Sequence, residues 1–238
     1  MECLLVGRLR SNPSLDAELK KAGVEALWLD GDSFPSETLL TWSGDAIRIG
    51  GRPAGHWPCF VCDYAPPYPH PQRRYAAGEW KGIRTDFPHL IINESEAGSV
   101  VRSVMEAAQA RGDCRPTLPA LNLCGHPEAL ALALHREGIP ATGPSAPLCG
   151  RVMLAADGTA ERLDPAGGEA TGPTVGPDLL WDTARAARAF LGLQFALIDI
   201  GASGAVVRVN PTPPWESLGR PWREKMIKWM LATLESRP

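Results

Sequence analysis

The opening of the chain alternates strand, helix and strand, and no other feature of the sequence limits the possible folds as strongly. The stretch CLLVG, residues 3–7, is a short apolar run typical of a buried strand. SLDAELKKAG follows, with Leu15 and Leu19 on one helical face and Gly23 as its C-terminal cap, and VEALWLD has the pattern of a second strand. Because two strands joined through a helix pair in parallel, this order predicts an α/β domain. The turn GRLRSNP lacks the G-x-G-x-x-G spacing, so a dinucleotide-binding fingerprint is absent.

The rest of the chain continues to alternate helices and strands. Asp157 and Gly158 mark a tight hairpin turn, and Pro127 and Gly138 mark the start and the end of an amphipathic helix. The pattern predicts strands at 59–64, 89–93 and 117–123, hairpins at 39–51, 151–163 and 194–210, and helices at 95–112, 126–138, 178–192 and 222–237.

A chain of 238 residues that is 44% hydrophobic and 21% charged has an ordinary globular composition and suits one large domain or two small ones. We expect an N-terminal α/β domain at 1–117 and a second domain at 118–238. A net charge of −3 offers no basic field for nucleic acid, and no stretch approaches the ~20 apolar residues of a membrane span. The N-terminus does not have the pattern of a signal peptide, so we expect a cytoplasmic protein with six reduced cysteines.

Three segments of the second half carry a resemblance to a known family. They are, in chain order, ALNLCGHPEALALALHREGIPATGP, RVMLAADGTAERL and ARAARAFLGLQFALIDIGASGAVVRVNPTPP. With these segments the chain resembles the ATP-grasp superfamily, in the style of glutathione synthetase and the ribosomal-protein glutamate ligases. The resemblance implies an α/β fold: a Rossmann-like, pre-ATP-grasp-like N-terminal domain, then a shortened ATP-grasp-like α+β core. It also implies ATP and magnesium as cofactors, and ligation of a carboxylate to an amine through an acyl phosphate.

The departures from this family concern the groups that hold the nucleotide. Members carry a lysine on the first helix of the core and another on a strand of the next subdomain, whereas this chain has no lysine between Lys81 and Lys225. In members, several dozen residues, including a glycine-rich lid, separate the G-I-P motif from an arginine-led strand. Here Pro140 and Arg151 are only about ten residues apart, too few for two strands of average length and a lid. The resemblance therefore implies a truncated, degenerate core, in which Arg151 is the candidate catalytic residue if the chain is active.

The last predicted hairpin is expected to bring an acidic residue, an arginine and an asparagine onto one face of a sheet. A two-residue turn at Ser203–Gly204, or a four-residue turn, pairs Asp199 with Arg208, whereas a three-residue turn excludes this pairing. The resemblance implies magnesium ligands at Asp199 and Asn210 and an acidic residue where Arg208 stands. A guanidinium cannot be a ligand, so we predict that Arg208 pairs with Asp199 and replaces the metal. The alternatives are a one-metal site completed by a further carboxylate, for which Glu216 is the candidate, and an ordinary cross-strand pair on a solvent face.

A proline-rich stretch, DYAPPYPHPQRRY, carries a second candidate site. Its prolines favour an extended, rigid backbone, and it groups aromatic with basic side chains. Arginines beside aromatic rings suit a carboxylate, a phosphate or a peptide, so we expect a loop here that binds a substrate or partner. Its candidate residues are Tyr68, His70, Arg73 and Arg74. The alternative is a rigid surface connection.

Two further patterns are explained by packing. Cys59 and Cys62 have C-x-x-C spacing, but no second pair follows at the spacing of a zinc site, so we expect them on alternate faces of a buried strand. Apolar side chains recur at helical spacing in the closing helix, which predicts core packing and leaves a dimer or partner surface as the alternative. They are Trp222, Met226, Trp229, Met230 and Leu234.

These observations predict a degenerate ATP-grasp-like protein without ligase activity that binds a peptide, a small acid or a protein partner. Two alternatives stay open: an active ATP-dependent carboxylate–amine ligase, and an α/β binding protein unrelated to the family. Nucleic acid and membrane are not expected as partners, and a homodimer stays an option. The resemblance implies ATP and magnesium as cofactors, whereas the departures from the family pattern make the binding of both doubtful.

Overall fold

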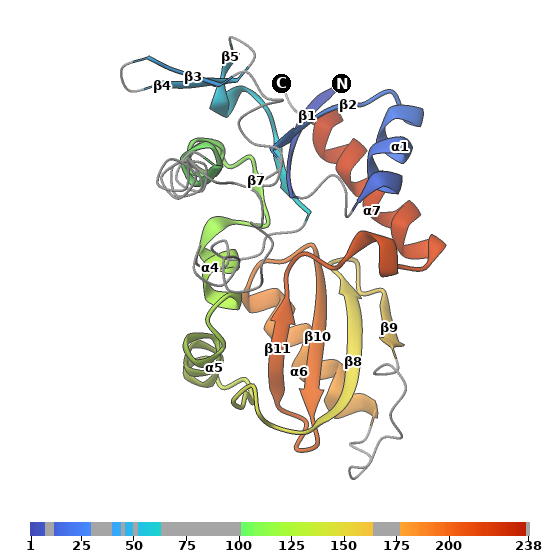
Figure 1. Cartoon of the computed structure of the whole chain (residues 1–238). Helices are drawn as coiled ribbons and strands as arrows, with labels where there is room; N and C mark the ends of the chain where they lie inside the picture. Colours follow the sequence, from blue (N-terminus) through green and yellow to red (C-terminus); the bar gives the residue numbers. More distant parts are fainter. Residues whose placement is uncertain are drawn as a thin grey trace, which may run out of the picture. The chain divides into compact units, whose positions relative to one another are not determined.

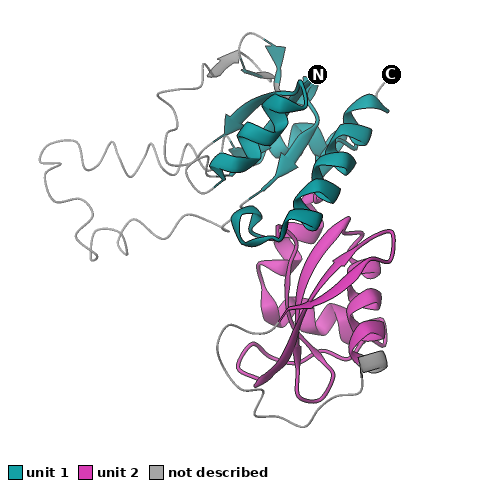
Figure 2. Ribbon diagram, turned by 90° about the vertical axis from the view of Figure 1, so that its right-hand side faces the viewer, with its two compact units in different colours: residues 1–115, 214–238 teal, residues 116–213 magenta. Residues whose placement is uncertain are grey.

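The chain divides into two compact units (Figure 2). The computed structural model describes residues 1–7, 12–29, 40–43, 46–49, 52–62, 101–163 and 177–236. Unit 1 consists of residues 1–115 together with 214–238, and unit 2 consists of residues 116–213. Unit 1 is therefore built from two separate stretches of sequence, with unit 2 inserted between them.

Unit 1 contains the parallel sheet that the opening pattern predicts. Its strands are β1 (Glu2–Val6), β2 (Glu25–Leu29), β6 (Cys59–Val61) and β7 (Cys114–Arg115), in the order β2-β1-β6-β7. Helix α1 (Pro13–Lys21) connects β1 to β2 and buries Leu15 and Leu19. Gly23, in the turn after this helix, has a φ of +74°, a conformation that glycine adopts without strain.

A second, smaller sheet in unit 1 is antiparallel. Strands β3 (Leu40–Ser43), β4 (Ala46–Ile49) and β5 (Arg52–Pro53) form it in that order, which confirms the hairpin expected at 39–51. The short helix η2 (Ala54–His56) follows β5. Residues 101–110 are helical, which confirms the described part of the helix expected at 95–112. The buried side chains of this part are Val101, Val104, Met105 and Ala108.

The last part of the chain returns to unit 1 as the short helix η3 (Trp215–Ser217) and helix α7 (Arg220–Glu235). These helices, α1 and the parallel sheet share one core, which confirms core packing for the apolar stripe of α7. The buried residues of this core are Cys3, Leu5, Leu15, Leu19, Val24, Phe60, Trp215, Met230 and Leu234. The domain division into 1–117 and 118–238 stays a prediction; it differs from the compact units in the placement of 214–238.

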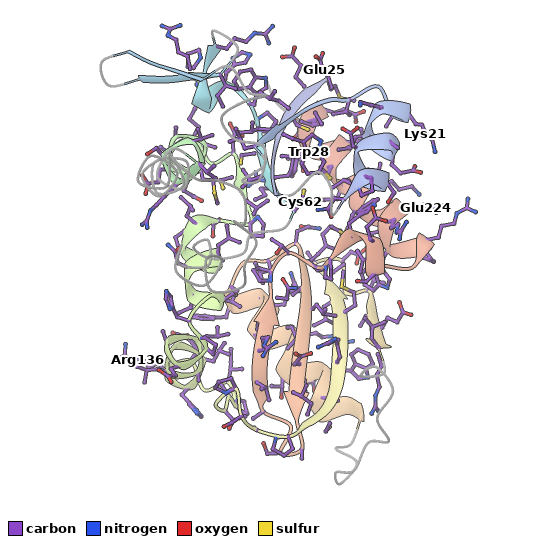
Figure 3. The ribbon with its side chains drawn as sticks, viewed as in Figure 1. Lys21, Glu25, Trp28, Cys62, Arg136 and Glu224 are labelled. Carbon is purple, nitrogen blue, oxygen red and sulfur yellow. The ribbon has the colours of Figure 1, made fainter. Side chains whose placement is uncertain are left out.

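Unit 2 is an antiparallel sheet with helices on one face. Strands β8 (Leu148–Ala155), β9 (Ala160–Leu163), β10 (Phe195–Gly201) and β11 (Val206–Asn210) form it in the order β11-β10-β8-β9. Helices α4 (Leu118–Cys124), α5 (Pro127–Arg136) and α6 (Pro177–Phe190) pack with it around one core, and Figure 1 shows α6 behind the strands. On α5, Leu130 and Leu134 are buried in this core, whereas Arg136 points away from the sheet (Figure 3).

One element differs in type from the expectation. The strand predicted at 117–123 is wrong, because α4 occupies this stretch. The hydroxyl of Thr117 accepts a hydrogen bond from the N–H of Ala120 at 3.4 Å, and Pro119 lies in the first turn, where no N–H is needed. The apolar pattern of this short stretch is compatible with a strand or a helix, and the hydrogen bond to Thr117 stabilises the start of the helix.

The other expected elements of unit 2 are confirmed. The hairpin at 151–163 is formed by β8 and β9, the helices at 126–138 and 178–192 are α5 and α6, and the hairpin at 194–210 is formed by β10 and β11. The strand predicted at 89–93 lies outside the described residues. Among the helices that the structure describes, none has the length and apolar character needed to cross a membrane.

Candidate functional site

The turn between β10 and β11 has three residues, 202–204, and not the two or four that the predicted pairing requires. Gly201 donates its N–H to the carbonyl of Ala205 at 2.9 Å, which closes the loop. Gly204 has a φ of +78°, the left-handed conformation that such loops place at one position. By itself, this turn would move Asp199 out of register with the arginine expected opposite it.

A β-bulge next to the turn restores the pairing. Ile200 pairs with Val206, whereas Asp199 pairs with Arg208, so Val207 is the extra residue on β11. The bulge compensates for the odd loop length. The predicted register of Asp199 and Arg208 is therefore confirmed, although the predicted turn that led to it is wrong.

Basic and acidic side chains alternate in one row across three strands of unit 2. Arg208 on β11, Asp199 on β10 and Arg151 on β8 are register partners, so their side chains share one face of the sheet. Core side chains such as Val152 and Ile198 lie at intervening positions and face the helices. The row therefore lies on the face of this sheet opposite to the described helices of unit 2.

Arg151 holds both carboxylate oxygens of Asp199. Its Nε atom donates to Oδ1 at 2.6 Å, and its Nη2 atom donates to Oδ2 at 3.2 Å. The Asp199 side chain is 6% exposed and that of Arg151 is 35% exposed, so the carboxylate is the more deeply buried partner. The hydrogen bond to Asp199 raises the pKa of Arg151, and burial of the guanidinium opposes this shift. A paired guanidinium and carboxylate fix each other's orientation.

The predicted ion pair between Asp199 and Arg208 is wrong in its partner. Arg208 lies opposite Asp199 in register, but it is exposed and makes no ion pair with any residue that the structure describes. Both arginines flank Asp199 on neighbouring strands, and the half-buried Arg151 forms the pair. The row thus contains one neutralised pair and one exposed cation.

The oxygen atoms that a magnesium ion would need at this place are engaged by protein groups. Both oxygens of Asp199 accept hydrogen bonds from Arg151, and Oδ1 of Asn210 accepts the N–H and the hydroxyl of Thr212 at 2.9 and 3.3 Å. Arg208 adds a cation opposite Asp199, and two like charges at contact distance repel by several kcal/mol in a protein. This donor set does not fit magnesium. In the described parts of the chain, no three His, Cys, Asp or Glu side chains form a group that could hold a metal ion.

The segment between α5 and β8 is short and is held against β11. The N–H of Thr142 donates to the carbonyl of Val206 at 2.8 Å, and the N–H of Val206 donates to the carbonyl of Pro140 at 2.9 Å. Ala141 forms an isolated parallel bridge with Val206 as a result. Residues 137–147, all of them described, contain no further strand or helix and lead directly into β8.

The other candidate residues do not belong to this row of side chains. Glu216 belongs to unit 1, where its Oε1 atom accepts the Ser14 hydroxyl at 2.7 Å and the Ser14 N–H at 3.0 Å, and Arg223 lies 3.7 Å from its Oε2 atom. Its carboxylate therefore caps the first turn of α1, and the one-metal alternative has no support for its third ligand. The loop residues outside the described part of the chain are Tyr68, His70, Arg73 and Arg74.

Comparison with known proteins identifies the fold. No family model and no curated protein sequence matches the chain. The ATP-grasp ligase PsnB, complexed with minimal precursor, Mg and ADP, matches with 15% sequence identity and a TM-score of 0.64, over 97% of this chain and 96% of PsnB. The macrocyclase MdnC from Microcystis aeruginosa MRC, bound with precursor peptide MdnA, matches with 13% identity and a TM-score of 0.63, over 98% and 100% of the two chains. This chain has an ATP-grasp fold.

A third ATP-grasp structure extends the likeness. A RiPP-associated ATP-grasp ligase from Chryseobacterium gregarium, in complex with ADP and a leader and core peptide, has 11% identity and a TM-score of 0.54, over 100% of this chain and 98% of that chain. At these identities the likeness is one of fold. The fold class predicted from the sequence is confirmed, with a parallel α/β sheet in unit 1 and the mixed helix-and-strand core of ATP-grasp proteins in unit 2.

Proposed function

We propose that this chain is a non-catalytic ATP-grasp protein that recognises a peptide carrying a carboxylate. The bidentate pair of Arg151 and Asp199 is the observation that carries the first half of the proposal. Both oxygens of the Asp199 carboxylate are held by a guanidinium, so a metal ion there would have to share them with that positive charge. Asn210, whose amide oxygen is engaged by Thr212, supports the same conclusion.

The distribution of lysine in the sequence supports the proposal independently. Phosphoryl transfer to a carboxylate depends on magnesium and on cationic side chains around the transferring phosphate. The chain has no lysine between Lys81 and Lys225, and residues 137–147 connect α5 to β8 without an intervening subdomain. Arg151, the cation that an active ligase would use, is already engaged by Asp199.

The ATP-grasp neighbours favour a peptide as the partner. PsnB was solved with its minimal precursor and MdnC with a precursor peptide. In this chain, Arg208 presents an exposed guanidinium on the face of the unit 2 sheet opposite to the described helices of that unit, without an ion-pair partner among the described residues. Because guanidinium groups bind carboxylates through two parallel hydrogen bonds, we expect an Asp, Glu or C-terminal carboxylate of the peptide to bind there.

Isothermal titration calorimetry with Mg-ATP tests the loss of nucleotide binding. We expect no binding tighter than about 100 μM, a free energy of roughly −5.5 kcal/mol, with PsnB as the positive control. Binding in the low micromolar range, or ADP release in the presence of a precursor peptide, would instead establish an active ligase. The variant Arg208→Glu places an acidic residue at position 208, as the family resemblance implies, and a gain of Mg-ATP binding in this variant would assign the loss of binding to Arg208 alone.

Fluorescence anisotropy with labelled peptides tests the partner class. We expect a Glu-rich decapeptide to bind more tightly than the same peptide with Gln at every Glu position. Arg208→Gln should weaken binding of the Glu peptide by about 5- to 10-fold, because one charge-assisted hydrogen-bonded contact is worth about 1–1.5 kcal/mol at an exposed site. Arg136→Gln, an exposed arginine on α5, is the matched control and should leave binding unchanged. Equal binding of both peptides would contradict the proposal.

A further inference from the structure

Two buried cysteines, distant in sequence, lie opposite each other in the parallel sheet of unit 1. Cys59 on β6 and Cys114 on β7 are register partners, and they are 0% and 1% exposed. Register partners on neighbouring strands share a face, and the strands are about 4.8 Å apart. This spacing is inside the range of about 4.4–6.8 Å that a disulfide spans between Cα atoms. Neither cysteine is part of a disulfide in this structure.

The pair is separate from the other cysteines of unit 1. Leu4 is the register partner of Cys59, so Cys3, one residue earlier on β1, lies on the other face of the sheet. Cys3 and Cys62 both pack in the core that α1 and α7 form on that face. Cys59 on β6 and Cys62, directly after this strand, therefore lie on opposite faces of the sheet, as the sequence predicts. Cys114 is the thiol with which Cys59 can react.

A hydrogen bond polarises the two thiols in opposite directions. The hydrogen bond between the side chains of Cys59 and Cys114, together with burial, raises the pKa of Cys59. The same hydrogen bond lowers the pKa of Cys114, burial opposes the shift, and Arg115 adds to the lowering. Burial raises the pKa of Cys3 to about 12, so that thiol stays protonated. Cys114 is therefore the more acidic thiol of the pair and the one that loses its proton first.

We propose that Cys59 and Cys114 form a reversible disulfide when hydrogen peroxide reaches them. The Cys114 thiolate attacks one peroxide oxygen: an S–O bond forms, the O–O bond breaks, and the released hydroxide takes up a proton to become water. The sulfur of Cys59 then attacks the sulfur of Cys114. The S–S bond forms, the S–O bond breaks, and the Cys59 proton leaves with the hydroxyl group as a second water. The two thiols lose two electrons, and the peroxide gains them.

The position of β7 gives the oxidant access to this buried pair. β7 has two residues and is the last of the described strands in the sheet order, with β6 as its neighbour. Short edge elements open locally at a free energy well below that of global unfolding. Local opening of β7 exposes Cys114 while β6 stays in place. The reaction should therefore be slow in buffer and faster in urea concentrations too low to unfold the protein.

The disulfide would enclose residues 60–113 in a covalent loop. This stretch of sequence contains the aromatic and basic segment, with Arg73 and Arg74, that the sequence analysis predicts as a partner loop. Because a crosslink restricts the unfolded chain more strongly when it closes a longer loop, oxidation should stabilise unit 1 against unfolding. It would also limit the conformations open to the enclosed segment.

Peptide mapping of the full chain tests the proposal. The reduced protein is treated with hydrogen peroxide, alkylated, digested without reductant and analysed by mass spectrometry. We expect a linked pair of peptides containing Cys59 and Cys114, lighter by two hydrogens, which disappears after treatment with dithiothreitol. Alkylation of both cysteines to the same extent before and after peroxide, or a preferred link between two other cysteines, overturns the proposal.

A thermal-unfolding measurement provides a second readout. Oxidised wild-type protein should unfold at a midpoint several degrees above that of the reduced form. Cys59→Ala and Cys114→Ala should show no such rise, whereas Cys149→Ala, a buried strand cysteine in unit 2, should behave as wild type. An equal rise in the Cys114→Ala variant contradicts the assignment. The mapping experiment needs no variant and decides the proposal even if a substitution prevents folding.

Discussion

Removal of Arg151 should destabilise unit 2 far more than removal of Arg208. In Arg151→Ala, the carboxylate of Asp199, now 6% exposed, would remain buried without its two hydrogen bonds. Loss of one partner from a fully buried ion pair costs about 3–5 kcal/mol. Because the Arg151 side chain is 35% exposed, water can reach part of the site. We therefore expect the free energy of unfolding to fall by about 2–3 kcal/mol.

The reverse truncation and the neighbouring arginine provide the comparison. Asp199→Ala leaves the partly exposed guanidinium of Arg151 free to turn towards water, so the loss should be smaller, about 1–2 kcal/mol. Arg208→Ala removes an exposed side chain without an ion-pair partner in the described structure, and should cost at most about 0.5 kcal/mol. The double variant Arg151→Met, Asp199→Leu removes both charges and should be more stable than Arg151→Ala.

Hydrogen exchange in urea, read by mass spectrometry on peptides from β8 and β10, measures these differences within unit 2. It avoids averaging over both units, as a spectroscopic signal from the whole chain would. The prediction is contradicted if Arg208→Ala lowers the free energy of unfolding as much as Arg151→Ala does, because Arg208 would then be the ion-pair partner of Asp199. It is also contradicted if the free energy of unfolding of Arg151→Ala lies within about 0.5 kcal/mol of the wild-type value, since the ion pair would then not be buried.

Two further predictions concern the carboxylate of Glu216 in unit 1 and the core of unit 2. The hydrogen bond from the Ser14 hydroxyl lowers the pKa of Glu216, burial opposes it, and the Ser14 N–H and Arg223 add to the lowering. A lowered folded-state pKa gives stability that is complete above the unfolded value and is lost as pH falls through the folded value. Glu216→Gln should therefore lower the melting temperature at pH 7, and the difference from wild type should vanish at acidic pH; a difference independent of pH would contradict this. Leu134→Ala should cost about 2–4 kcal/mol in urea unfolding, because Leu134 is 0% exposed, whereas Leu132→Ala on the same helix, 55% exposed, should cost less than about 0.5 kcal/mol.

Local signals in the sequence were sufficient for most elements and for one register. Helix α5 follows from its flanking Pro127 and Gly138, and the hairpin of β8 and β9 follows from Asp157 and Gly158. The pairing of Asp199 with Arg208 was also correct, but it depends on two compensating features that the sequence pattern does not show separately. A three-residue loop and a bulge together give the same register as a two-residue loop without a bulge.

The partner of Asp199 could not be predicted in the same way. The pairing within one hairpin is a local property, so Arg208 was the visible candidate. Arg151 is distant in sequence, and it becomes a neighbour only because β8 lies beside β10 in the sheet. Strand order and side-chain burial both result from packing of the whole unit. The helix α4 was missed for the opposite reason, since its signal, a threonine cap followed by a proline, was local but lay in a short and ambiguous stretch.

The discontinuous build of unit 1 determines the order in which the chain can fold during synthesis. Residues 1–115 leave the ribosome first, then all of unit 2, and only then the segment 214–238 that supplies Trp215, Met230 and Leu234 to the unit 1 core. At translation rates of about 5–20 residues per second, the nascent sheet waits roughly 6–25 seconds without its last helix. During this interval an apolar face stays exposed, while unit 2 can already be complete. We therefore expect the early half of the chain to be prone to aggregation until residues 214–238 complete its core.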